Sequence, residues 1–541
     1  MSQIRSAGWG FPLSLAVLIL YFHLGFRESC TVVRGIGVLL AGGVFVASLK
    51  WRWESRLPVC RSRNESVFFS AASFLFLAGQ LSLFTFPDKI LRLGSELGWN
   101  GTPYDSLPKY LYATVIFFLG AAAWYAVKRL LLLVWRYLEE PLTGLWHSLD
   151  RFDAVLFTLG ILVGGTFTIW TFYTTNVFYY PCRMAGEAPV FNVIFTSDSG
   201  LLAQQCSYVN LFSGENDFRQ MLFALYSLPL YLFHLSVCFL PPESFFRGIA
   251  YALPQLAFLQ GSFLILVRLL RLERWDKVVF FFFANCTFPA MLFTLLQEQY
   301  VIAVFFLLLY LLLRQDRNAG VLLAGAGGTL TTSGAALFLA PGISWKERGK
   351  TFVQAALFGG SAMLLTAKWG IIVTLFKQVR LYTSFTGQTV TWGEKLEQYL
   401  QFLAGCFIAP RVTEIGDSLQ LAPPSGRIPW AGVFVVILLL CGFLFNRRDD
   451  RALLSFNWML FSLFLLLLIG WGSPENGMIL YSLYFQWAFS ALVWLLAEKI
   501  LNRRRTALRL TILAAAVGML WFNLPALYSL WSWGVVHYPA F

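Results

Sequence analysis

The chain has 541 residues, of which 58% are hydrophobic and 13% are charged, with a formal net charge of +13 and a mean hydropathy of +0.65. This balance excludes a water-soluble globular domain. Most of the positive charge is what the anchoring of cytoplasmic loops requires, so it does not predict a nucleic-acid partner. The composition predicts an all-α polytopic membrane protein.

Apolar runs of roughly 17 to 25 residues, the length that crosses a bilayer, recur along the chain and predict about fifteen transmembrane helices. In chain order they lie near 9–26, 32–49, 67–87, 111–127, 153–173, 220–240, 248–267, 279–296, 299–313, 320–341, 352–376, 429–445, 452–471, 478–498 and 508–532. The 299–313 run is short for a span, and 320–341 is weak enough to be re-entrant. The first run has no small-residue cleavage site after it, so we interpret it as an uncleaved signal anchor.

The first four spans form a predicted N-terminal membrane region over 1–150, and 151–541 form the main region. Short loops rich in Lys and Arg mark the cytoplasmic side. These anchors are Lys50, Arg52, Arg56, Arg61 and Arg63; Lys128, Arg129, Arg136 and Arg151; Arg447, Arg448 and Arg451; and Arg503, Arg504 and Arg505. With about fifteen spans they predict a cytoplasmic N-terminus, an external C-terminus, and external segments at 88–110, 174–219, 377–428 and 472–477.

One group of cations disobeys this rule, because by the same count it falls outside. Its members are Arg268, Arg271, Arg274 and Lys277. Two interpretations remain open at this point. Either a helix has been miscounted between 219 and 278, or external cations persist because they bind an anion such as a lipid phosphate. Arg380 and Arg411, in the 377–428 loop, raise the same second possibility.

The 174–219 loop is the first long polar loop after the fifth predicted span, and it carries Asp198, Glu215, Asp217 and Arg219. Asp198 either caps a short surface helix or accepts a proton from a sugar hydroxyl as that oxygen attacks an activated carbon. Glu215 and Asp217 are alternative bases, or ordinary solvated acids. Arg219 could hold a phosphate, pair with one of these acids, or extend to the membrane surface.

The same loop contains Cys182 and Cys206, which would form a disulfide in an oxidising compartment or remain unrelated thiols. No metal site is indicated, because the four histidines are scattered and no cysteine pair has zinc-ligand spacing. The pattern indicates no organic cofactor and leaves the use of a divalent cation open.

A span, a long external loop with an acid, a return span that opens Asp217-Phe-Arg-Gln-Met-Leu-Phe-Ala-Leu-Tyr-Ser-Leu-Pro229 and many later helices together resemble the GT-C superfamily of polytopic glycosyltransferases. The resemblance is architectural and covers roughly 150–500. The chain departs from the family pattern in its four preceding helices and in lacking an adjacent pair of acids in the loop.

The resemblance implies a long external loop with short interfacial helices, a polyprenyl-phosphate sugar donor, and a glycan or lipid acceptor at the bilayer surface. It also implies that an external acid, by position Asp198, is the base, and that cations of later loops hold the donor phosphate. Direct displacement would invert the sugar carbon. Glu475, in the late external loop Gly470–Gly477, could contact sugar hydroxyls or belong to an ordinary turn.

Such an enzyme would lie in the plasma (inner) membrane of a bacterium, with its active site outside the cytoplasm. Two other functions remain open on the sequence. One is a lipid-linked oligosaccharide polymerase or ligase. The other is a transporter or flippase for lipid-linked sugars, which should show inverted repeats and broken helices.

Overall fold

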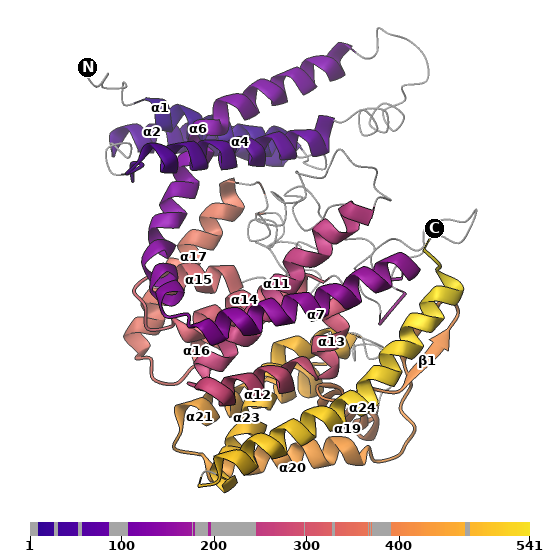
Figure 1. Cartoon of the computed structure of the whole chain (residues 1–541). Helices are drawn as coiled ribbons and strands as arrows, with labels where there is room; N and C mark the ends of the chain where they lie inside the picture. Colours follow the sequence, from indigo (N-terminus) through magenta and orange to yellow (C-terminus); the bar gives the residue numbers. More distant parts are fainter. Residues whose placement is uncertain are drawn as a thin grey trace. The chain divides into compact units, whose positions relative to one another are not determined.

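The computed structural model describes residues 9–25, 31–51, 57–85, 107–175, 177–178, 193–195, 245–296, 298–326, 330–365, 367, 369, 391–470, 477–501 and 503–540. These residues are mostly helical (Figure 1), as predicted for an all-α membrane protein. Among the described residues, five helices are long and apolar enough to cross a membrane, or six if one bent pair forms a single span. The coarse class is thus confirmed, and the count of about fifteen spans stays a prediction.

The chain divides into two compact units. Unit 1 comprises Met1–His147, Val209–Ser236 and Ala356–Thr374. Its described helices include α1 (Gly10–Gly25), α2 (Thr31–Lys50), α4 (Arg63–Thr85) and α6 (Leu107–His147). Its core is apolar, with Phe11, Leu15 and Phe22 of α1 buried.

Unit 2 comprises Ser148–Tyr208, Val237–Ala355 and Leu375–Phe541. Its elements, with α17 continuing into unit 1, are α7 (Arg151–Thr174), α11 (Phe245–Leu269), α12 (Arg274–Asn285), α13 (Phe288–Leu295), α14 (Gln299–Leu312), α15 (Ala319–Ala326), α16 (Leu330–Leu339), α17 (Trp345–Leu365), α19 (Trp392–Gly405), β1 (Val412–Ile415), β2 (Ser418–Leu421), α20 (Trp430–Phe445), α21 (Asp450–Ser462), the π-helix η2 (Leu463–Ile469), α22 (Gly477–Leu480), α23 (Ser482–Leu501) and α24 (Arg505–His537).

Helices α7 and α11 pack antiparallel. Asp153, at the start of α7, pairs with Arg268 at the end of α11. Farther along, a Cβ added at Gly164 would lie 2.8 Å from Leu256, so glycine permits this close approach. The chain therefore leaves α7 and enters α11 at the same end of the unit. The predicted 220–240 span lies outside the described residues and stays a prediction.

The predicted 279–296 span is broken in the structure. Helices α12 and α13 meet at a bend of 69°. Pro289 opens α13, and a proline favours a kink or break in a helix because it lacks the N–H and its ring clashes with the preceding turn. Asn523 of α24 satisfies the break: its amide donates to the carbonyl oxygens of Cys286 at 2.8 Å and Phe407 at 2.9 Å.

The segment 319–341 begins and ends at one end of unit 2. Arg314 precedes α15, and its Nε donates to the carbonyl of Pro341, which follows α16, at 3.4 Å. Arg348 donates to the carbonyl of Ala340 at 2.6 Å. The α15–α16 hairpin thus returns to its starting side, in keeping with the re-entrant interpretation rather than a full crossing.

The loops at this end of unit 2 form what we call the basic end, defined by residues 148–153, 268–277, 312–317, 447–451 and 498–509. Arg451 donates to the carbonyl of Leu270 at 2.6 Å. Arg509 lies 2.7 Å from Asp276, and Arg505 pairs with the same carboxylate at 3.3 Å. The 268–277 cations therefore lie beside the loops assigned to the cytoplasm, so the predicted external position of these cations and the predicted cytoplasmic position of those loops cannot both hold.

The other end of unit 2, which we call the hairpin end, is defined by residues 175–178, 193–195, 411–428 and 537–540. The Thr175 hydroxyl donates to the carbonyl of Tyr538 at 2.8 Å, and the Tyr538 hydroxyl donates to the carbonyl of Asp417 at 2.7 Å. Figure 1 shows β1 beside the last turns of α24. Because α24 starts at Arg505 in the basic end, the two ends lie at opposite ends of this long helix.

Candidate functional site

Two loops that the sequence places outside the membrane meet at the hairpin end. Strands β1 and β2 form an antiparallel hairpin that turns at Gly416, where φ is +58°. Ile194 pairs with Leu419 in parallel register. The Phe195 N–H donates to the Leu419 carbonyl at 2.9 Å, and the Leu419 N–H donates to the Val193 carbonyl at 2.7 Å. Residues 193–195 therefore form an isolated parallel bridge to a hairpin that the all-α prediction did not contain.

Phe195, at the end of this bridging segment, packs into the interior of unit 2. Its side chain is fully buried and packs edge-on against Phe288, with ring centroids 6.4 Å apart. Its φ of +51° is uncommon for an aromatic residue and turns the chain sharply. Asp198 follows after three residues, and three residues span at most about 11 Å. Asp198, the predicted base, itself lies outside the described residues.

Arg411 lies at the base of the same hairpin. Its carbonyl accepts a hydrogen bond from the Ala422 N–H at 2.9 Å. Its side chain is exposed and forms no hydrogen bond or ion pair with the residues that the structure describes. An exposed guanidinium at this position is available to an anion from outside the protein.

A buried carboxylate stiffens the loop beside Arg411. Glu397 of α19 accepts hydrogen bonds from the Ser425 N–H at 2.6 Å and the Gly426 N–H at 2.9 Å. These bonds use the acid to satisfy backbone donors, which is a structural role. Of the acids at the hairpin end, Glu414 and Asp417 are exposed.

The other predicted site residues are distributed as follows. Those outside the described residues are Asp198, Glu215, Asp217, Arg219, Arg380, Glu475, Cys182 and Cys206. Those at the basic end are Arg268, Arg271, Arg274 and Lys277. The structure therefore does not bring the 268–277 cations together with Arg411, and the argument that they are external and need an external phosphate no longer holds.

Two of these basic-end cations already have acidic partners. Lys277 lies 2.6 Å from Asp150 and 3.0 Å from Asp153, and Arg268 also pairs with Asp153. Burial tends to raise the pKa of Asp150, but the hydrogen bond from Lys277 and the N–H of Asp153 outweigh it and hold that pKa below its ordinary value. Asp150 and Asp153 also form the capping box of α7. This cluster is explained by folding alone.

Sequence reasoning missed Glu298, a fully buried acid between α13 and α14. Its N–H donates to the side chain of Gln255 at 3.0 Å, and the Gln255 amide donates to the Leu296 carbonyl at 2.7 Å. The available signal was a single acid between the apolar runs 279–296 and 299–313. An ionisable residue between spans is a functional hypothesis by default.

Among the described residues, no group of three or more His, Cys, Asp or Glu side chains could hold a metal ion. No protein-family model, curated protein or solved structure matches this chain. Its function therefore has to be argued from its own residues.

Proposed function

We propose that this chain is a membrane glycosyltransferase that moves a sugar from a polyprenyl-phosphate donor to a glycan or lipid acceptor at the hairpin end. The observation that carries the proposal is the pairing of residues 193–195 with β2. It links the loop that carries Asp198 to the loop that carries Arg411. Such a transfer needs an acid and a cation, and these two residues would supply them.

The chemistry requires two groups on opposite sides of the sugar carbon. The acceptor oxygen attacks the anomeric carbon while Asp198 takes its proton. The bond from that carbon to the phosphate oxygen breaks, and the electron pair leaves with the phosphate. The guanidinium of Arg411 stabilises the charge that develops there, and preorganised stabilisation of this kind is usually the largest contribution to catalysis. Displacement from one side inverts the carbon.

The outer surface of unit 2 supports a lipid-linked donor. Long apolar side chains point outward along α7 and α24, including Leu162, Trp521 and Phe522. Such a surface is expected to contact lipid, so a prenyl tail can lie in the bilayer while its phosphate reaches the hairpin end. The rule that cations face the cytoplasm then places the hairpin end outside, in the plasma membrane of a bacterium.

A transporter or flippase for lipid-linked sugars is the second candidate, because the break between α12 and α13 is a feature of such proteins. The carbonyl of Cys286 at this break already accepts a hydrogen bond from Asn523. A break that the protein itself satisfies offers fewer free groups to a substrate, so we rank this function second.

The test is sugar transfer by the purified chain in proteoliposomes that contain a polyprenyl-phosphate sugar. Asp198→Asn should lower the turnover by about 100-fold or more, the usual effect of losing a general base, while donor binding is retained. Asp417→Asn is the matched control, since it removes an exposed acid from the same end.

Wild-type turnover by Asp198→Asn would move the role of base to Glu215 or Asp217. Movement of intact donor between leaflets, with no transfer to any acceptor, would favour the flippase. Equal losses in Asp198→Asn and Asp417→Asn would indicate a general effect of charge and contradict the proposed role.

A further inference from the structure

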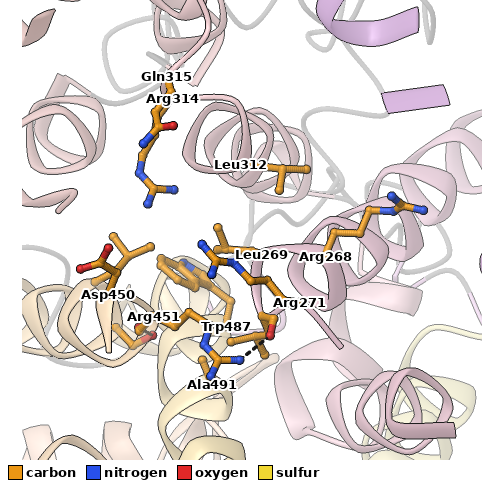
Figure 2. A pocket seen from close by; sticks show the side chains of 13 residues that line it. Arg268, Leu269, Arg271, Leu312, Arg314, Gln315, Asp450, Arg451, Trp487 and Ala491 are labelled. Carbon is orange, nitrogen blue, oxygen red and sulfur yellow. Dashed lines mark hydrogen bonds between the residues drawn. The ribbon is translucent and has the colours of Figure 1, made fainter. Parts of the chain in front are cut away.

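A cavity of about 170 Å³ lies at the basic end, where the C-terminal ends of α11 and α14 meet the N-terminal end of α21 (Figure 2). Four arginines line it: Arg268, Arg271, Arg314 and Arg451. Asp450 is the one acid among its lining residues. This excess of guanidinium groups around a cavity is the feature to be explained.

Two of the four arginines are held by acids outside the cavity. Arg268 pairs with Asp153, and in Figure 2 its guanidinium points away from the other three. Arg451 lies 2.7 Å from Asp449, two residues earlier in the sequence. Both charges are therefore compensated within the fold.

Arg314 is only partly engaged. It donates to the carbonyl of Leu311 at 2.6 Å and to that of Pro341 at 3.4 Å, which uses two of its five N–H groups. Burial lowers the pKa of the guanidinium, and the charge of Arg271 lowers it further, although Asp450 acts in the opposite direction. The cavity thus holds a partly dehydrated charge with donors to spare.

Arg271 is exposed and forms no side-chain hydrogen bond or ion pair within the described part of the chain. In Figure 2 its side chain and that of Arg314 point toward the same space. Trp487, nearly fully buried, lines the cavity as well. Arg271 and Arg314 therefore offer unused donors to one cavity.

The backbone at Arg271 makes this arrangement more telling. Its N–H donates to the Arg268 carbonyl at 2.9 Å, and the Leu272 N–H donates to the Val267 carbonyl at 3.1 Å. This is a Schellman cap, in which the residue at the position of Arg271 is usually glycine. With φ at +56°, an arginine there costs roughly 1 kcal/mol or more relative to glycine. Glycine would stabilise this cap more than arginine does. The presence of arginine here therefore indicates a role for its side chain.

We propose that this cavity is a binding site for a compact phosphate group, held by Arg271 and Arg314. A planar guanidinium matches phosphate oxygens in pairs, which favours phosphate over a single-charge halide. The cavity of 170 Å³ is smaller than the roughly 300 to 1,000 Å³ of sites for whole small molecules. The ligand is therefore free phosphate or the headgroup phosphate of an anionic lipid, which is abundant in cytoplasmic leaflets.

This site lies at the end of unit 2 opposite to the proposed transfer reaction, so it is independent of the Asp198 hypothesis. The experiment measures the thermal unfolding midpoint of the whole chain in phosphatidylcholine nanodiscs as sodium phosphate is titrated against sodium chloride at matched ionic strength. A second arm replaces part of the phosphatidylcholine with phosphatidylglycerol. A ligand that binds only the folded state raises the midpoint, and the stabilisation grows with the logarithm of the ratio of ligand concentration to Kd.

Arg271→Gly is the decisive variant, because it removes the guanidinium while relieving the backbone. Its midpoint without phosphate should equal or exceed that of the wild type, and its apparent affinity for phosphate should fall about ten-fold or more. Arg274→Gly is the matched control: it removes the same charge, it also relieves a positive φ, of +43°, and Arg274 does not line the cavity. Arg271→Asn, which tolerates the same φ, provides a second variant if the first fails to fold.

A shift with free phosphate in phosphatidylcholine discs identifies soluble phosphate as the ligand, and a shift only with phosphatidylglycerol identifies a lipid headgroup. Either supports the site if Arg271→Gly abolishes the shift and Arg274→Gly keeps it. No shift in the wild type in either arm overturns the proposal. So do equal losses in the two variants, since a general electrostatic field would then explain the binding.

Discussion

Asp153 is the acid around which the basic end of unit 2 is organised. Its side chain is 1% exposed, and it serves both Arg268 and Lys277. Removing one partner from a buried ionic cluster leaves the remaining charges uncompensated, which costs far more than the net value of the cluster. The stability of this end therefore depends on one carboxylate more than on any of the cations around it.

Asp153→Asn should destabilise the folded protein by about 3 kcal/mol, because it leaves two cations with one acid between them. Asp150→Asn is the comparison, since Asp150 also contacts Lys277 but its side chain is 49% exposed. It should cost about 1 kcal/mol, the usual value of a helix cap. Denaturation of the purified variants in detergent, followed by circular dichroism, measures both. Similar losses would mean that burial does not set the cost.

At this scale the sequence indicates which residues are unusual but not what they contact. The cations at 268–277 stand out because they violate the charge rule as first counted. Asp153 does not stand out, because it lies at the start of an apolar run, where an acid is expected to cap the N-terminus of a helix. Its partners are more than one hundred residues away, and no local pattern predicts so distant a contact.

Among the elements, the bend between α12 and α13 depends on one amide from α24. Asn523 is fully buried and also accepts a hydrogen bond from the Ala409 N–H at 2.7 Å. It thus links α12, the end of α19 and α24 through three backbone groups. A buried backbone group left without a partner costs about 1 to 3 kcal/mol.

Asn523→Leu keeps the volume and removes the partner of the Cys286 carbonyl and of the Ala409 N–H, while the Phe407 carbonyl keeps the Phe288 N–H. It should lower stability by roughly 3 kcal/mol, about twice the cost of one unsatisfied group. Asn446→Leu is the control: its amide also donates to two carbonyls, those of Gly442 and Leu495. Asn446 is half-buried at the basic end, where water can replace it. The yield and thermal midpoint of the two purified variants should separate them clearly, and equal effects would argue against a special role for the bend.

Hydropathy predicted the apolar character of these elements and missed their interruptions. The 279–296 run looks continuous because a proline barely changes its average hydropathy, although Pro289 is itself a signal for a break. The β1–β2 hairpin was also missed. Its alternation of apolar and polar residues around Gly416-Asp417 is a recognised hairpin pattern, but it is short and lies in a loop expected to be external and irregular.

For the whole molecule, the count of membrane crossings and the charge rule assign 268–277 to different sides. Counting spans from hydropathy put 268–277 on the side of 377–428. The contacts of Arg451 with Leu270 and of Arg505 with Asp276 put it at the other end of unit 2. The second arrangement agrees with the assignment of the 447–451 and 503–505 loops to the cytoplasm, and it favours the interpretation that a helix is miscounted between 219 and 278.

This arrangement predicts the labelling of single cysteines at 274, 448 and 417, all exposed positions, in a chain whose eight native cysteines are replaced by serine. In intact cells an impermeant maleimide should label position 417, because Asp417 belongs to the hairpin end. It should label positions 274 and 448 only after the membrane is opened, because Arg274 and Arg448 belong to the basic end. Cysteine at 448 serves as the reference for the cytoplasmic side. Labelling of 274 together with 417 in intact cells would mean that the two ends do not lie on opposite sides of the membrane. Both the corrected topology and the assignment of Arg411 to a different face from Arg271 would then be wrong.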